Sequence, residues 1–72
     1  MFSERFRELR LFETPKLNQT ELGKRLKMTQ RKISRLETGA TEPTTDEIVR
    51  ICRYYNVSAD YLLGLTDEYK TL

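Results

Sequence analysis

Residues 18–39, NQTELGKRLKMTQRKISRLETG, contain the pattern that decides the fold. Asn18 is a residue type that caps helix N-termini, and Glu21 three positions later completes a capping-box pattern. Leu22 and Leu26 follow at a spacing of four, which places both side chains on one face of a helix. The stretch therefore opens with a short helix that buries one face.

The same pattern restarts at Thr29, a second cap residue, and the apolar pair Ile33 and Leu36 follows it. The connection between the two helices is so short that they must cross at a steep angle, as in a helix-turn-helix. Gly23 supports this geometry. A glycine inside a helix costs about 1 kcal/mol relative to alanine, and we expect it where the other helix crosses too closely for a side chain. The second helix, 30–37, is expected to carry its polar residues outward.

The composition is that of one small soluble domain. Of the 72 residues 38% are hydrophobic and 33% charged, which argues against disorder. Strand-like alternation is absent, so we predict an all-α fold of five helices, with the domain at 1–65 and, at 66–72, a tail that is a candidate dimer contact. No apolar run approaches the ~20 residues of a membrane span, and the charged N-terminus does not resemble a secretory signal. We expect a cytoplasmic protein.

The residue types that carry most catalytic and metal chemistry are missing. The chain has no histidine and a single cysteine, which argues against a zinc site and excludes an intramolecular disulfide. Cys52 falls on an apolar helix face and is interpreted as a buried small hydrophobe rather than a nucleophile. No paired carboxylates or phosphate-binding glycine loop is visible. We therefore predict no enzymatic activity, no cofactor and no metal.

The charge is unevenly distributed along the chain. The formal net charge is +2, yet residues 18–38 hold six basic and two acidic side chains, whereas residues 39–72 hold three basic and six acidic ones. The six central basic residues are Lys24, Arg25, Lys27, Arg31, Lys32 and Arg35. A basic island of this kind is expected of a polyanion binder, and a solvated helix face is the alternative. Its coincidence with the helix-turn-helix pattern favours the first interpretation.

The N-terminal segment predicts a helix from about Ser3 to Phe12 or Glu13, and Pro15 requires that it has ended. Its apolar stripe consists of Phe2, Phe6 and Leu9. The residues expected to face water are Glu4, Arg5, Arg7 and Glu8. A loop at 13–16 then leads to Leu17, which is expected to pack on the following helix.

The segment after the helix-turn-helix contains another capping box. Gly39 suits a left-handed helix end, and after a loop at 40–43 the pair Thr44 and Glu47 begins a helix at 45–55. The buried stripe of this helix is expected to be Ile48, Ile51 and Cys52, with Tyr55 at its end.

A last short helix is predicted near the C-terminus. Asn56 is expected to end the preceding helix, and Ser58 to cap a helix at 59–63 that stops at Gly64. Either Tyr61 or Leu62 should be its buried residue. From Leu65 onward we expect a tail that frays unless a partner orders it.

Taken together, these motifs resemble the phage-repressor and Xre family of helix-turn-helix regulators. Three segments carry the resemblance: FRELR at 6–10, LNQTELGKRL through ISRLETG at 17–39, and EPTTDEIVRICRYYNVSADYLLG at 42–64. It extends from about Phe6 to Asp67. The resemblance implies a compact five-helix, lambda-repressor-like DNA-binding domain whose second motif helix lies in the major groove.

The resemblance also implies which side chains contact DNA. Expected to reach base edges are Gln30, Arg31, Ser34 and Arg35. Expected to contact the DNA backbone are Gln19, Thr29, Lys32, Arg10, Thr38 and Thr41. Gln can bond bidentately to adenine and Arg to guanine, each contributing about 1–3 kcal/mol of discrimination. Gln19 is further expected to brace Gln30.

Two positions leave alternatives open. Arg10 matches an arginine that often contacts the DNA backbone, but Glu37 matches a glutamate that often pairs with that arginine, so the two roles compete. The loop at 11–16 is about two residues longer than usual, which leaves the register of Arg10 open as well. Lys27 stands where the family often has glycine. If its φ is positive, lysine carries strain of about 1 kcal/mol there.

The leading functional interpretation is a sequence-specific transcriptional regulator, a repressor, that binds double-stranded DNA at a near-palindromic operator as a homodimer. The alternative is an antitoxin-like or other protein-binding module that masks a toxin and autoregulates its own operon. Either a dimer interface or a toxin would use the apolar and aromatic residues Tyr54, Tyr55, Tyr61, Leu65, Tyr69 and Leu72. Of these, Tyr55 and Tyr61 are more readily interpreted as core.

Overall fold

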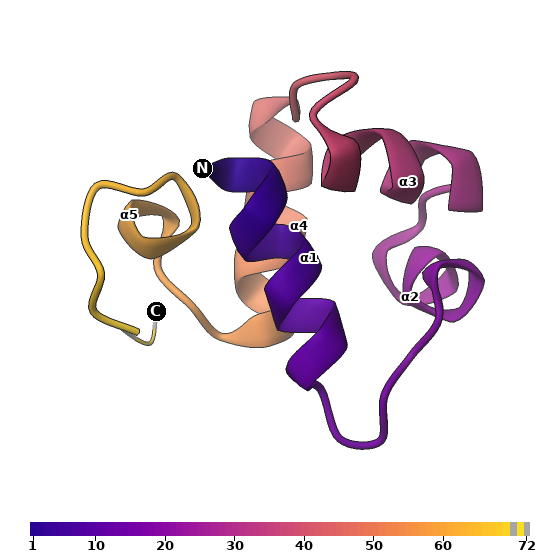
Figure 1. Cartoon of the computed structure of the whole chain (residues 1–72), viewed down its shortest axis with the longest axis horizontal. Coiled ribbons are helices and arrows are strands. Elements are labelled where there is room, and N and C mark those ends of the chain that lie inside the picture. Colours follow the sequence, from indigo (N-terminus) through magenta and orange to yellow (C-terminus); the bar gives the residue numbers. More distant parts are fainter. Residues whose placement is uncertain (70, 72) are drawn as a thin grey trace.

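The computed structural model describes residues 1–69 and residue 71 (Figure 1). These residues form five helices and no strand, which confirms the all-α prediction. The helices are α1 (Phe2–Phe12), α2 (Gln19–Leu26), α3 (Gln30–Thr38), α4 (Thr45–Tyr55) and α5 (Ala59–Leu62). Within the described ranges, no helix is long and apolar enough to cross a membrane.

Side-chain caps start the last four helices at the predicted residues. Asn18, Thr29, Thr44 and Ser58 each accept a hydrogen bond from the amide three positions later. At α2 and α4 the capping box is complete, because a glutamate carboxylate in turn accepts the cap residue's own amide. These bonds satisfy amides that would otherwise have no partner at the helix start.

Three helices end in the left-handed conformation. Lys27, Gly39 and Asn56 have φ of 58°, 79° and 55°. After each of them, the next amide bonds back to the carbonyl five positions earlier, which closes the helix end. The condition under which lysine would be strained at position 27, a positive φ, is therefore met, and lysine has no short polar side chain to favour this conformation.

Gly23 is required, but by a different neighbour from the one expected. A Cβ at this position would lie 2.5 Å from the carbonyl oxygen of Met28. The close approach comes from the backbone of the turn, rather than from the crossing helix itself. The tight turn folds back over α2, so the glycine allows the turn and not the helix crossing.

One continuous core connects all five helices. α3 packs on α2 and α1, while α4 packs on α2 and α5. The buried apolar residues are Phe6, Leu9, Leu17, Leu22, Leu26, Ile33, Leu36, Ile51, Cys52, Val57 and Leu62. Phe2 and Ile48, expected in buried stripes, are only partly buried against this cluster, as are Tyr55 and Tyr61.

The expectation that Arg5 faces water is wrong. Its side chain is 13% exposed and donates to the Tyr61 and Thr66 carbonyls and, at 2.6 Å, to the Asp67 carboxylate. The guanidinium also lies 4.4 Å over the Tyr61 ring. These contacts tie the segment after α5 to α1, so the residues from Leu65 to Tyr69 return along the domain where a frayed tail was expected. Leu72, another residue of the predicted apolar end, lies outside the described residues.

A buried ion pair joins α1 to α3. Arg10 Nε and Nη2 donate to the two carboxylate oxygens of Glu37 at 2.7 and 2.9 Å. The Arg10 side chain is 11% exposed and that of Glu37 only 1%. The third nitrogen of the guanidinium, Nη1, donates to the Leu17 carbonyl at 3.2 Å. The hydrogen bond with Glu37 raises the pKa of Arg10, which keeps the guanidinium charged.

We predict that Lys27→Gly stabilises the domain. The substitution removes the left-handed strain of lysine, and a gain of about 1 kcal/mol would raise Tm by about 4–8 °C in a domain of this size. The matched control is Lys24→Gly, three residues earlier in the right-handed part of α2, which should lower stability by about 1 kcal/mol. Thermal unfolding followed by circular dichroism measures both. A lower Tm for Lys27→Gly would show that the left-handed lysine is not strained.

We also predict that the Arg10–Glu37 pair is costly to break and far less costly to replace. Glu37→Ala leaves a buried guanidinium unpaired and should cost about 3–5 kcal/mol in urea unfolding. The double variant Arg10→Met with Glu37→Met should recover most of that loss, because no buried charge remains. Arg7→Met, at an exposed position on the same helix, is the control and should change little. A double variant as unstable as the sum of its single variants would contradict this account.

Candidate nucleic-acid interface

α3 presents one face to the core and the opposite face to solvent. In Figure 1 it runs along the edge of the molecule, beside α2. Its buried residues are Ile33, Leu36 and Glu37. The outer face carries Gln30, Arg31 and Arg35, all exposed, with Ser34 half-buried between them. The structure therefore brings together, on one exposed face, the four side chains predicted to contact bases.

Gln30 is held by a chain of hydrogen bonds that runs into the core. Its Nε2 donates to Gln19 Oε1 at 2.7 Å, and Gln19 Nε2 donates to Glu37 Oε1 at 3.0 Å. Glu37 is in turn fixed by Arg10. The predicted brace between Gln19 and Gln30 is therefore present. It uses one of Gln30's two N–H groups and leaves its carbonyl oxygen and the other N–H available, which is what a bidentate contact needs.

Arg31 and Arg35 are exposed cations. Neither side chain forms an ion pair or hydrogen bond with any residue that the structure describes. Lys32 differs, because its ammonium lies 3.4 Å from Glu47 and so ties α3 to α4. An unpaired guanidinium can reach a base edge or a phosphate without first losing a protein partner. The positive charge of this face that is free for a ligand thus comes from the two arginines.

The loop after α3 is less open to a phosphate than expected. The amides of Ala40 and Thr41 both donate to the Arg35 carbonyl, at 2.9 and 3.4 Å. The Thr38 hydroxyl donates to the same carbonyl at 3.3 Å. These groups therefore close the C-terminal end of α3, and the half-buried Thr41 is left with its hydroxyl as a candidate contact.

Thr29 and Arg10 have roles within the fold. The Thr29 hydroxyl accepts the Lys32 amide at 3.1 Å as the cap of α3. Of the two roles that competed for Arg10, the ion pair with Glu37 is the one the structure contains, and all three guanidinium nitrogens are engaged. Arg10 thus positions α3 through Glu37, and its two remaining N–H groups belong to a side chain that is only 11% exposed.

Sequence reasoning missed Arg50, which supports the turn of the motif from α4. Its Nη1 donates to the Leu26 and Lys27 carbonyls at 2.8 and 3.2 Å, and its Nη2 pairs with Asp46 at 2.8 Å. These are carbonyls at the end of α2, where no helix amide is left to bond them. The spacing of four between Asp46 and Arg50 was the available signal, since it predicts a pair on one helix face.

The structure gives no support to nucleophilic or metal chemistry at Cys52. The thiol is buried, and burial raises its pKa, which disfavours the reactive thiolate. Among the described residues, no cluster of three or more His, Cys, Asp or Glu side chains is arranged to hold a metal ion.

Comparison with known proteins agrees with this geometry. A family model described as a helix-turn-helix domain matches residues 2–63. The chain is 34% identical over 68 residues to the uncharacterized HTH-type transcriptional regulator YobD of Bacillus subtilis (strain 168). The aligned region covers 94% of this chain and 59% of that protein. The chain thus spans little more than half the length of this relative.

A solved structure has the same fold. The P22 c2 repressor, crystallised in complex with a synthetic operator, superposes with a TM-score of 0.76 at 31% sequence identity, covering 86% of this chain and 91% of the repressor chain. The family model, the shared fold and the braced outer face of α3 lead to one conclusion. The chain belongs to the helix-turn-helix family of the Xre and lambda-repressor type.

Proposed function

We propose that this chain is a transcriptional regulator that binds double-stranded DNA sequence-specifically through α3, as a repressor acting in the cytoplasm. The observation that carries the proposal is the outer face of α3. Gln30 is braced there by Gln19, and two exposed arginines have no partner among the described residues. A helix of this kind fits the major groove of B-DNA. The P22 c2 repressor, which has this fold, was crystallised with a synthetic operator, and this supports DNA binding by the present chain.

We assign the contacts by what each side chain has free. Gln30, Arg31 and Arg35 read bases, with Ser34 beside them. Gln19 contacts the DNA backbone from the first turn of α2, where the helix dipole and the first amides favour an anion. Lys32 and the hydroxyls of Thr29, Thr38 and Thr41 are secondary backbone contacts, because the structure already uses most of these groups internally.

We further propose that the chain acts as a homodimer on a near-palindromic operator. Exposed apolar side chains gather after α4: Leu63 is 40% exposed, Leu65 77% and Tyr69 60%. Apolar and tyrosine side chains of this kind are typical of protein interfaces. A second copy bound there would give the assembly two α3 helices, which is the number that an operator with two half-sites requires. An antitoxin-like module that masks a toxin would use the same surface, and this remains the alternative.

The experiment that tests the function is selection of random duplex DNA by the purified protein at roughly 150 mM salt. Non-specific phosphate binding is strongly weakened at that ionic strength, so a sequence preference becomes visible. We expect enrichment of an inverted repeat whose half-sites are about one helical turn, roughly 34–36 Å, apart. Enrichment of a single half-site would contradict the dimer. If no sequence were enriched, the protein-binding alternative would replace this proposal.

We predict that Arg31→Ala and Arg35→Ala weaken operator binding through α3, whereas Arg53→Ala does not. Arg53 is an exposed cation on α4, so its removal changes the net charge equally without touching the proposed interface. An arginine that reads guanine should cost about 1–3 kcal/mol and relax one base position. One that contacts phosphate should weaken all sequences alike and lower the salt slope by about 1. Fluorescence anisotropy over a salt series measures both. If all three variants lost the same operator affinity, the losses would be explained by net charge alone, and this would contradict a specific role for α3.

A further inference from the structure

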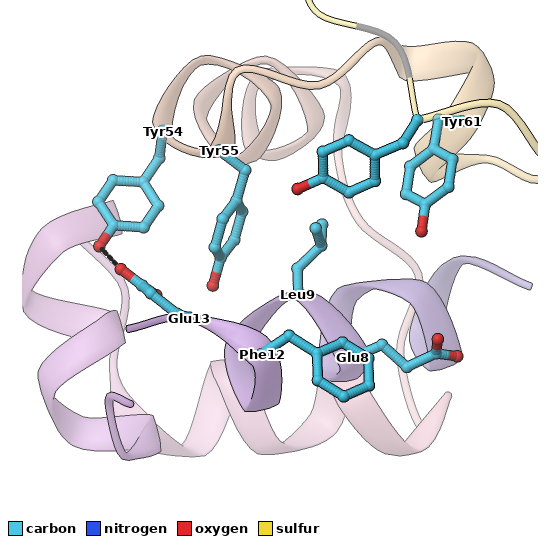
Figure 2. A pocket seen from close by; sticks show the side chains of 8 residues that line it. Glu8, Leu9, Phe12, Glu13, Tyr54, Tyr55 and Tyr61 are labelled. Atoms are coloured by element: carbon cyan, nitrogen blue, oxygen red, sulfur yellow. Dashed lines mark hydrogen bonds between the residues drawn. The ribbon is translucent and has the colours of Figure 1, made fainter. Parts of the chain in front are cut away.

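A cavity of about 480 Å³ opens between α1, α4, α5 and the segment after α5 (Figure 2). It is lined by four tyrosines, two glutamates, Leu9 and Phe12, and none of these residues belongs to α2 or α3. Its volume is within the range of about 300–1,000 Å³ that is usual for small-molecule sites. The cavity is therefore separate from the proposed DNA-binding face and large enough for a ligand.

The inner wall of this cavity holds two polar atoms without a partner. The Tyr54 hydroxyl donates to Glu13 Oε2, drawn as the dashed line in Figure 2. The other carboxylate oxygen, Glu13 Oε1, and the Tyr55 hydroxyl are both buried and form no well-aligned hydrogen bond within the described part of the chain, although Glu13 is a close acceptor neighbour of that hydroxyl. Burial first, and then the charge of Glu13, raises the pKa of Tyr55, so this hydroxyl stays protonated. A buried carboxylate oxygen without a donor is costly, and an N–H group entering the cavity would satisfy it.

The cavity also has the charge and the aromatic surface that suit a cation. Glu8 lines it with an exposed carboxylate that has no partner among the described residues. Tyr61 and Tyr69 form the opposite wall, with ring centroids 5.0 Å apart. Arg5 already lies 4.4 Å over the Tyr61 ring. Aromatic faces attract cations, and the attraction grows when water is excluded.

The neighbouring arginines compensate this negative charge only in part. Arg10 is paired with Glu37 and Arg5 with Asp67, so both are already neutralised. Arg25 donates at 3.4 Å to the Tyr54 hydroxyl, the same hydroxyl that donates to Glu13, so it offsets part of the Glu13 charge. Because two carboxylates and, among the described residues, no basic side chain line the cavity, its lining still carries a net negative charge.

We propose that this cavity binds a small organic cation that carries N–H donors, an amidinium or primary ammonium on a compact apolar body. The charged group would donate to Glu13 and lie against the tyrosine rings, while the apolar body would pack on Leu9 and Phe12. Phe12 is 77% exposed at the rim, where an apolar body would cover it. The N–H requirement follows from the unpartnered oxygen of Glu13, which a quaternary ammonium could not satisfy. The proposal does not depend on DNA binding.

The test is a titration of the ¹⁵N-labelled protein with benzamidine and, separately, with benzamide, its neutral isostere, followed by NMR. We expect benzamidine to shift the amides around Leu9–Glu13, Tyr54–Tyr55 and Tyr61, and to bind roughly tenfold tighter than benzamide. Equal affinity for both compounds, or no shift in these amides up to about 10 mM, would overturn the proposal. Shifts of the Leu9–Glu13 and Tyr54–Tyr55 amides on dilution of the protein alone would mean that self-association extends from the proposed dimer contact into the cavity, which would also overturn the proposal.

Two variants locate the charge that matters. Glu13→Gln keeps an acceptor for Tyr54 but removes the carboxylate, and should abolish the preference for benzamidine. Glu42→Gln, an exposed position in the loop before α4, removes the same charge away from the cavity and should preserve the preference. A Glu13→Gln protein that still prefers benzamidine would overturn the proposal. If that variant loses the dispersed spectrum of a folded protein, Glu8→Gln takes its place and should reduce the preference several-fold.

Discussion

The geometry of this domain depends on one carboxylate. Glu37 is almost wholly buried and accepts hydrogen bonds from Arg10 through both of its oxygens and from Gln19. Removing two charges from water costs several kcal/mol per ion, and such a pair persists only where every polar group is satisfied. The third nitrogen of Arg10 donates to the Leu17 carbonyl, so every nitrogen of the guanidinium and both oxygens of the carboxylate have a partner. This one ion pair therefore connects α1, α2, α3 and the loop before α2.

This convergence has a consequence for the outer face of α3. Glu37 and Gln30 lie on the same helix, and Gln19 bonds to both. A rotation of α3 about its axis would break one of these bonds and leave a buried carboxylate under-satisfied. The orientation of Gln30 is thus fixed by the burial of a charge that itself contacts no ligand. The pairing also explains why an acidic residue stands in an otherwise basic segment.

The local structure of this chain could be predicted because its signals are local. Each cap at Asn18, Thr29, Thr44 and Ser58 acts on an amide three residues away, so sequence spacing alone reveals it. The left-handed ends at Lys27, Gly39 and Asn56 likewise close over five residues. The four residues predicted to contact bases lie on one face for the same reason, since they belong to one helix.

The roles of Arg5 and Arg50 could not be predicted in this way. Arg5 and Arg7 both lie on the polar side of α1, yet Arg5 is held by groups 56 to 62 residues away and Arg7 is exposed. Only the return of the chain after α5 distinguishes them, and that depends on tertiary packing. Arg50 clamps carbonyls 23 and 24 residues away for the same reason. The prediction that the tail frays failed for the same reason, because the contacts of Arg5 that hold this segment cannot be read from the sequence.

The count of basic residues in a segment consequently overstates the charge that a ligand meets. Of the six in residues 18–38, Lys32 is paired with Glu47 and Arg25 is hydrogen-bonded to Tyr54, whereas no partner within the described residues is present for Lys24, Lys27, Arg31 and Arg35. A cation that already has a carboxylate partner must give up that partner, at least in part, before it can neutralise a phosphate. An unpaired cation gives up only water and counterions. Arg31 and Arg35 are both unpaired, and the rotation of the helix that carries them is fixed. Their charges are therefore free for a ligand, and the points on α3 from which their side chains extend are defined, which suits the sequence-specific contact that we propose.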